Sequence, residues 1–174
     1  MDFNQNYFEI FQLPQAFELD LALLSRRNLE LQKRVHPDKF VDATTSERRL
    51  SMQWTTQINE AYATLGSSLR RAIYLLTLEG KEIANNPQLD PMFLMEQIEL
   101  REELEQIEEA TDGIELLDHF RASVSKIMKT LEGDFSACYA AKEIAGAEQA
   151  VYKMQFINKL AIAANNVEEK LLDY

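Results

Sequence analysis

The feature that most constrains this chain is its scarcity of residues that interrupt helices. Only five glycines and four prolines occur among 174 residues. Glycine weakens a helix interior through its backbone freedom, and proline breaks it because it has no N–H to donate. Residues with high helix propensity, such as Leu, Ala, Glu and Gln, are abundant. The sequence therefore predicts an all-α fold, with long helices and short connections typical of antiparallel bundles.

The pronounced break in composition lies between residues 79 and 90, in the string EGKEIANNPQLD. Gly80 can end a preceding helix, and Asn-Asn-Pro at 85–87 is typical of a turn. Asp90-Pro91 is typical of a helix N-cap followed by the first helical residue. We therefore predict two domains with a linker between them. Their bounds are residues 1–78, residues 79–90 for the linker, and residues 91–174.

The net charge of −11 comes entirely from the second half of the chain. Residues 1–78 hold nine basic and nine acidic side chains, whereas residues 79–174 hold nine basic and twenty acidic ones. This asymmetry indicates two units with different partners. It also argues against nucleic-acid binding by the second unit, because a phosphate backbone is neutralised by cations.

Composition also limits the class of protein. No apolar stretch has the roughly 20 residues needed to cross a bilayer, and MDFNQNYFEI lacks the basic and apolar regions of a secretory signal. The single cysteine, Cys138, excludes an internal disulfide and a Cys-based zinc or iron–sulfur site within one chain. We expect it to be a small buried residue on a helix. These features favour a cytoplasmic protein with no cofactor, no bound metal and no membrane partner.

Start and stop signals divide the first domain into four helices and the second into three. Pro14 stops the first helix, Asp20 can cap the second, and Glu47 suits the first turn of the third. In the second domain, breaks are predicted at Thr111-Asp112-Gly113 and at Gly133-Asp134. The predicted helices cover residues 4–13, 20–35, 45–65, 69–78, 91–110, 114–132 and 136–172.

A rigid corner follows the second predicted helix at His36, Pro37 and Asp38. Because proline restricts the residue before it, the helix must end at His36. At about 100° per residue, the core-facing side chains of this helix lie opposite a basic face. The residues of this basic face are Arg26, Arg27, Lys33 and Arg34. A basic face that ends in a fixed corner is suited to docking on an acidic protein surface.

The His-Pro-Asp triplet by itself does not identify a function. It arises by chance in roughly one chain of this length per hundred, and a basic helix face is often only solvated. A His–Asp pair also occurs in acid–base and metal sites. However, no nucleophile lies near it in the sequence, and the only other histidine is His119. An enzyme is therefore disfavoured, although the triplet does not decide the matter.

The wider sequence resembles the J-domain, in which a His-Pro-Asp loop joins two antiparallel helices. YFEIF at residues 7–11 resembles its first helix, and INEAY at 58–62, through Leu65, resembles its third. The resemblance implies that His36, Pro37, Asp38 and the basic face engage a heat-shock ATPase chaperone and stimulate its ATP hydrolysis. Asn28 departs from the pattern, because it lies on the core face where an apolar or aromatic residue is usual.

The first predicted helix of the second domain carries apolar residues on two faces. A core stripe consists of Phe93, Leu100, Leu104 and Ile107. A second patch, well over a quarter-turn away, consists of Leu94, Met95 and Ile98, with Glu99 and Glu102 beside it. On the last helix, Phe156 points away from a core stripe formed by Ala147, Val151, Met154 and Ala161. The second patch is either a docking surface or a second buried face.

The second domain resembles the HscB family of J-domain co-chaperones of iron–sulfur cluster assembly. FLMEQIELREEL at 93–104 and EEKLLD at 168–173 carry this resemblance, which runs over the whole chain. The Gly/Phe-rich linker and zinc repeats of large J-proteins are missing. The resemblance implies a binding site for the iron–sulfur scaffold protein formed by Leu94, Met95, Ile98, Glu99, Glu102 and Phe156. Gln106 stands where an acidic residue would fit the family better.

The resemblance implies a co-chaperone rather than an enzyme. Its expected architecture is an N-terminal J-domain, a helical hairpin with flanking helices, followed by a C-terminal three-helix bundle. The implied partners are a specialised heat-shock ATPase chaperone (HscA-like) and the iron–sulfur scaffold protein (IscU-like), with no nucleic acid. A general J-protein adaptor for another client remains an alternative, as does self-association through the apolar patch.

Overall fold

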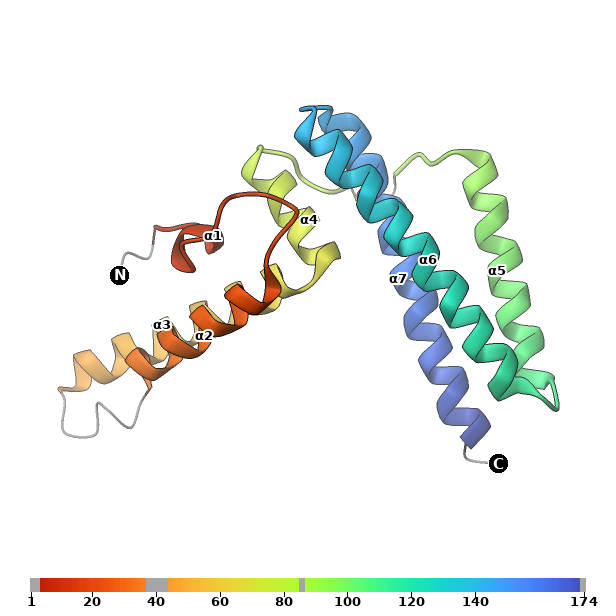
Figure 1. Cartoon of the computed structure of the whole chain (residues 1–174), viewed down its shortest axis with the longest axis horizontal. Coiled ribbons are helices and arrows are strands. Elements are labelled where there is room, and N and C mark those ends of the chain that lie inside the picture. The colour runs from red at the N-terminus through yellow and green to blue at the C-terminus, as the bar shows by residue number, and fades with distance from the viewer. Residues whose placement is uncertain (1–3, 37–43, 85–86, 173–174) are drawn as a thin grey trace. The chain divides into compact units, whose positions relative to one another are not determined.

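The computed structural model describes residues 4–36, 44–84 and 87–172. The chain divides into two compact units after Gly80, and each is described by itself. Within the described ranges every regular element is an α-helix (Figure 1). The predicted all-α fold is therefore confirmed. Pro37 and Asp38 lie outside the described residues.

The first unit is built on a helical hairpin. Its helices are α1 (Tyr7–Ile10), α2 (Leu21–Val35), α3 (Thr45–Gly66) and α4 (Ser68–Leu78). Helices α2 and α3 lie side by side (Figure 1). The Asp20 side chain accepts a hydrogen bond from Leu23 N, and Thr44 with Glu47 forms a capping box. The predicted starts of α2 and α3 are confirmed, because capping depends on residues adjacent in sequence.

Helix α1 is shorter than the predicted helix over residues 4–13. Asn6 and Glu9 form a capping box at its start. At its end Gln12 adopts a φ of 53°, and Leu13 N donates to Phe8 O at 2.8 Å, which closes the helix after a single turn. Phe8 and Phe11 are each only 1% exposed. Burial of these two rings, rather than helix length, holds the segment in place.

A buried arginine lies in the core of the first unit. Arg71 Nε donates to Phe17 O at 2.8 Å, and its Nη1 donates to Leu65 O at 2.5 Å. Its guanidinium also lies 5.0 Å from the centre of the Phe17 ring. The cation is tolerated because carbonyls and the ring replace the water it loses. The fully buried apolar side chains of this core are Phe8, Phe11, Leu24, Ile58, Leu65, Leu75 and Leu76.

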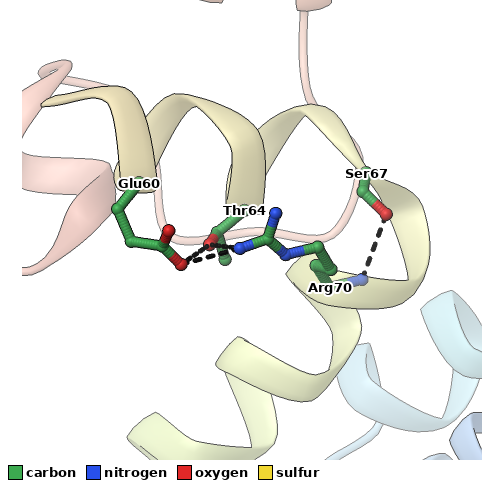
Figure 2. A network of polar contacts seen from close by, with 4 residues as sticks. All are labelled: Glu60, Thr64, Ser67 and Arg70. Atoms are coloured by element: carbon green, nitrogen blue, oxygen red, sulfur yellow. Dashed lines mark hydrogen bonds and ion pairs between the residues drawn. The ribbon is translucent and has the colours of Figure 1, made fainter. Parts of the chain in front are cut away.

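The turn between α3 and α4 is tied by the neighbouring arginine. Ser67 is both the C-cap of α3 and the N-cap of α4, and its Oγ accepts from Arg70 N at 3.3 Å. Figure 2 shows the Arg70 guanidinium directed at Glu60 and Thr64 on α3. Its Nη2 lies 2.7 Å from Glu60 Oε1 and 3.2 Å from Thr64 Oγ1. These contacts are largely solvent-exposed, so their contribution to stability is small.

The second unit is a bundle of three helices. They are α5 (Pro91–Glu109), α6 (Gly113–Ala140) and α7 (Ile144–Leu172). Helices α6 and α7 lie side by side over most of their length, and α5 packs on both (Figure 1). Asp90 caps α5 with Pro91 at its first position, as predicted. Before α5, Ala84 N donates to Tyr152 OH at 2.9 Å, which holds the preceding segment against α7.

The predicted break at Gly133-Asp134 is wrong. Helix α6 continues through both residues, because Leu131, Phe135 and Tyr139 extend one buried stripe past the glycine. A single glycine in a helix costs about 1 kcal/mol, which burial of this stripe exceeds. Helices 114–132 and 136–172 are therefore replaced by α6 and α7, with the turn at 141–143.

The true turn after α6 carries no glycine. Lys142 adopts a φ of 59°, and Glu143 N donates to Cys138 O at 2.8 Å, while Lys142 N donates to Tyr139 O at 3.1 Å. These two bonds form a Schellman motif, in which glycine is the usual left-handed residue. The Lys142 ammonium lies 5.3 Å from the centre of the Tyr139 ring. Because this position is occupied by lysine rather than glycine, the turn could not be predicted from the sequence.

Ion pairs tie the helices of the bundle together. Arg121 on α6 donates two hydrogen bonds to Glu168 on α7, at 2.6 and 2.8 Å. These bonds lower the pKa of the Glu168 carboxyl below its ordinary value. Lys170 Nζ on α7 lies 2.5 Å from Glu108 Oε1 on α5. Cys138 lies on α6, as expected, but it is only partly buried rather than buried.

We predict that Gly133→Ala raises the free energy of unfolding by about 0.5–1 kcal/mol. A β-carbon there meets no atom within 4 Å, so only the helix-propensity gain remains. In the matched variant Gly113→Ala, the β-carbon lies 2.7 Å from Ile107 O, and we expect a loss of about 1–3 kcal/mol. Urea unfolding followed by circular dichroism measures both. A destabilising Gly133→Ala would contradict the continuous helix α6.

We predict that Arg71→Ala lowers the free energy of unfolding by about 2–3 kcal/mol, because two buried carbonyls lose a charged donor. The neighbouring variant Arg70→Ala removes an equal charge from the surface and should cost less than about 1 kcal/mol. Thermal and urea unfolding of both variants test this. Equal losses would show that Arg71 is not the buried anchor of the first unit.

Candidate functional site

The first candidate surface lies at the C-terminal end of α2. His36 is its C-cap, with φ −57° and ψ 129°, and its side chain is exposed. The extended backbone there is the geometry that a following proline imposes. Lys33 and Arg34 occupy the last turn of α2, where cations are favoured by the helix dipole. The part of the predicted chaperone site that the structure describes therefore lies at an exposed helix end with cationic side chains.

The end of α2 is fixed to α3 by polar contacts that the sequence did not reveal. Ser51 Oγ donates to Val35 O at 2.5 Å, and both residues are buried. Three residues before Val35, Gln32 Nε2 on α2 donates to Asn59 Oδ1 on α3 at 3.0 Å. These bonds hold the backbone just before His36 and thereby fix where the corner begins.

The four residues of the basic face differ in their surroundings. Arg26, Lys33 and Arg34 are exposed, whereas Arg27 is partly buried. Arg27 Nη1 donates to Phe11 O at 2.5 Å and also to Gln12 O. These hydrogen bonds hold the end of α1 against α2, so Arg27 stabilises the structure beneath the basic face. The other three leave their charge available to a partner.

Asn28, the departure from the J-domain pattern, lies partly buried beside this face. Its Oδ1 is buried and accepts no hydrogen bond from any residue that the structure describes. An amide oxygen left in this way is unfavourable, so Asn28 weakens the local packing of α2. It does not lie among the exposed cations, and the basic face stays intact.

The second candidate surface is the apolar patch on α5. Leu94, Met95 and Ile98 are 41%, 63% and 56% exposed. Phe93, Leu104 and Ile107 on the opposite side of α5 are buried. Within the second unit, the bundle therefore covers only one of the two apolar faces of α5. Adjacent exposed side chains of this size are typical of a protein-docking surface.

The predicted acidic residues flank this patch. Glu99 and Glu102 are exposed on α5, and so is Gln106 one turn further on. The sequence argument missed Met92, which is 71% exposed at the start of the same helix. It was missed because the periodicity did not assign it to either face. The apolar surface thus begins two residues, or about half a turn, earlier than expected.

The structure brings Phe156 on α7 to the α5 helix. Its ring meets the Phe93 ring edge to face, with centroids 6.1 Å apart. Lys159 Nζ lies 5.4 Å from the centre of the Phe156 ring, and Lys153 Nζ lies 5.2 Å from that of Phe93. Phe156 is partly exposed, and the ring it contacts, Phe93, lies on the buried face of α5. Its place in the scaffold site therefore stays a prediction.

A metal site requires several ligands close together, and a membrane span requires a long apolar helix. Among the residues that the structure describes, no three His, Cys, Asp or Glu side chains gather closely enough to hold a metal ion. No helix in the described ranges has the length and apolarity needed to cross a membrane. The arrangement offers two protein-docking surfaces on two separate units.

A basic helical hairpin followed by a three-helix bundle with an exposed apolar patch defines a J-domain co-chaperone. Comparisons with known proteins support this class. Residues 89–165 match the family model described as the HSCB C-terminal oligomerisation domain. The co-chaperone protein HscB homologue of Vibrio cholerae is 44% identical over 169 residues, covering 96% of this chain and 99% of the relative. That of Aliivibrio salmonicida is 43% identical with the same coverage.

Solved structures agree with these relatives. The chaperone HscB of Vibrio cholerae superposes with a TM-score of 0.86 at 43% identity, covering 96% of this chain and 99% of that one. The human co-chaperone HscB gives 0.89 at 27% identity, covering 100% and 86%. Yeast Jac1, at 19% identity and a TM-score of 0.71, shares the fold. The chain belongs to the HscB family of J-domain co-chaperones of iron–sulfur cluster assembly.

Proposed function

We propose that this chain carries the iron–sulfur scaffold protein to a specialised Hsp70-type ATPase chaperone and stimulates ATP hydrolysis by that chaperone. The observation that carries the proposal is an exposed apolar patch of Leu94, Met95 and Ile98 on one unit, with an exposed basic helix end on the other. The two surfaces suit two different partners. No reaction takes place on the chain itself, and it acts in the cytoplasm.

The basic helix end of the first unit is the proposed chaperone site. Arg26, Lys33 and Arg34 provide a positive surface that steers the approach of an acidic partner and sets its orientation. His36, Pro37 and Asp38 form the corner that makes the specific contact. Because Ser51 holds the backbone of Val35, the end of α2 is already positioned before the chaperone binds.

The apolar patch of the second unit is the proposed scaffold site. Leu94, Met95, Ile98 and Phe156 provide apolar anchors, and Glu99 and Glu102 form an acidic edge. A few buried anchors usually supply most of the binding free energy, while charged edges select the partner. A scaffold surface with apolar side chains and nearby cations fits this arrangement. Once both partners are bound, hydrolysis in the chaperone fixes it on the scaffold.

We predict that His36→Gln abolishes stimulation of the chaperone's ATP hydrolysis and leaves scaffold binding unchanged. The substitution replaces the imidazole at the exposed C-cap of α2 and leaves the Asp20 N-cap unchanged. Steady-state ATP hydrolysis with and without the scaffold, together with calorimetric titration of the scaffold, provides the two measurements. The matched control is His119→Gln, which changes an exposed histidine on α6. Loss of scaffold binding in His36→Gln would contradict the model of two independent sites.

We predict that Leu94→Ala and Ile98→Ala each weaken scaffold binding by at least about 1 kcal/mol, roughly fivefold in Kd. Phe156→Ala should weaken it further, because it also removes the contact with Phe93. The control Ile162→Ala removes an isoleucine that is 53% exposed on α7, against 56% for Ile98. Unchanged stimulation of ATP hydrolysis in the absence of scaffold is expected for all four variants. An Ile162→Ala loss equal to that of Ile98→Ala would rule out a specific patch.

Self-association must be separated from scaffold binding in that experiment, because the matching family model is described as an oligomerisation domain. Light scattering of the protein alone, at the titration concentrations, gives its mass. If Leu94→Ala changes this mass and leaves scaffold affinity unchanged, the patch is a self-association surface and the proposed function fails.

A further inference from the structure

A groove between α5 and α7 begins where the apolar patch ends. Its volume is about 350 Å³, and its lining includes Arg101, Leu104, Glu105, Lys159 and Leu160. Arg101 lies three residues after Ile98, and Lys159 lies three residues after Phe156. Side chains three apart on a helix are neighbours on its surface. The groove is therefore continuous with the proposed scaffold site.

Three cations line this groove, and two of them, Arg101 and Lys159, lack carboxylate partners. The third, Lys170, pairs with Glu108, which also lines the groove, and outside it Arg121 pairs with Glu168. Neither Arg101 nor Lys159 forms an ion pair with any residue that the structure describes. Residues 79–174 hold twenty acidic side chains against nine basic ones, so unpaired cations are not expected there from composition. Glu105 also lines the groove, but it does not pair with either cation.

The helical positions give the patch two edges of opposite charge. Arg101 lies only about 20° around α5 from Leu94, on the side of the groove. Glu99 lies roughly 140° from Leu94, on the far side of the patch, and Glu102 lies roughly 80° from Leu94, between Ile98 and Met95 around the helix. Lys159 extends the basic edge onto α7 and covers one face of the Phe156 ring. A partner that buries the patch must therefore meet a cationic edge as well as an acidic one.

We propose that Arg101 and Lys159 bind a carboxylate side chain of the scaffold protein, which enters the α5–α7 groove while its apolar residues cover Leu94 and Ile98. This inference rests on the proposed function and assigns a second charge requirement to the same partner. A partner that covered these two cations would remove water from both charges. Unless the partner supplied an anion, nothing would offset the free-energy cost of that desolvation. The Arg101 guanidinium offers two parallel donors to the carboxylate, and Lys159 adds a point charge over the face of the Phe156 ring.

The test is titration of the scaffold with full-length Arg101→Glu and Lys159→Glu variants at low and high salt. We expect each to raise the Kd by at least about tenfold at low salt, with a smaller effect at high salt. The control Lys126→Glu makes an equal charge change at an exposed position on α6 and should alter the Kd less than about twofold. Neutral variants Arg101→Gln and Lys159→Gln should give intermediate losses, and thermal unfolding checks that every variant folds.

Charge reversal on the scaffold identifies the carboxylate. Each exposed Asp or Glu of the scaffold is changed to Lys in turn. One such variant should bind the unmodified chain weakly and recover affinity with Lys159→Glu, which a merely structural role for Lys159 does not produce. If Leu94→Ala weakens binding while Arg101→Glu and Lys159→Glu do not, the proposed function stands and the carboxylate site is overturned. If the unmodified chain does not bind the scaffold, both are overturned.

Discussion

The packing of α6 against α7 is the interaction on which the second unit depends. Phe120, Phe135 and Val151 are almost completely buried between these helices, and each such side chain contributes about 1.5–3 kcal/mol. The buried apolar stripe of α6 continues past Gly133, so the helix does not end at that glycine. The turn falls instead at Lys142. The α6–α7 pair is held together by buried apolar side chains along its length. Helix α5 packs on this pair through only one of its two apolar faces. Its other face remains exposed as Leu94, Met95 and Ile98.

The chain separates two kinds of recognition into two units. The first unit has no net charge but concentrates exposed cations at the end of α2. The second carries the whole negative charge, yet presents an apolar patch with an acidic edge and, at the α5–α7 groove, a basic edge. Under the proposed function, this difference in charge helps each partner to distinguish one surface from the other.

Several residues of the proposed sites are also structural. Arg27 belongs to the basic face by position, but its guanidinium caps the carbonyls at the end of α1. Phe156 belongs to the proposed scaffold site, but its ring packs on Phe93 and beneath Lys159. A substitution at either position changes both binding and packing. The exposed positions Arg26 and Ile98 report on the surfaces alone, because their side chains lie mostly in solvent.

The sequence by itself determined the all-α class and the starts of α2, α3 and α5, and it predicted the residues that are proposed for both surfaces. Capping and helical periodicity act between residues a few positions apart, so they are legible without a structure. Only the tertiary structure decided that α6 passes through Gly133, that Arg27 caps α1, and that Arg101 and Lys159 meet at one groove. These features depend on contacts between segments distant in the chain. Burial and ion pairing across helices outweigh the local preference for a break or a solvated cation, and no local pattern records them.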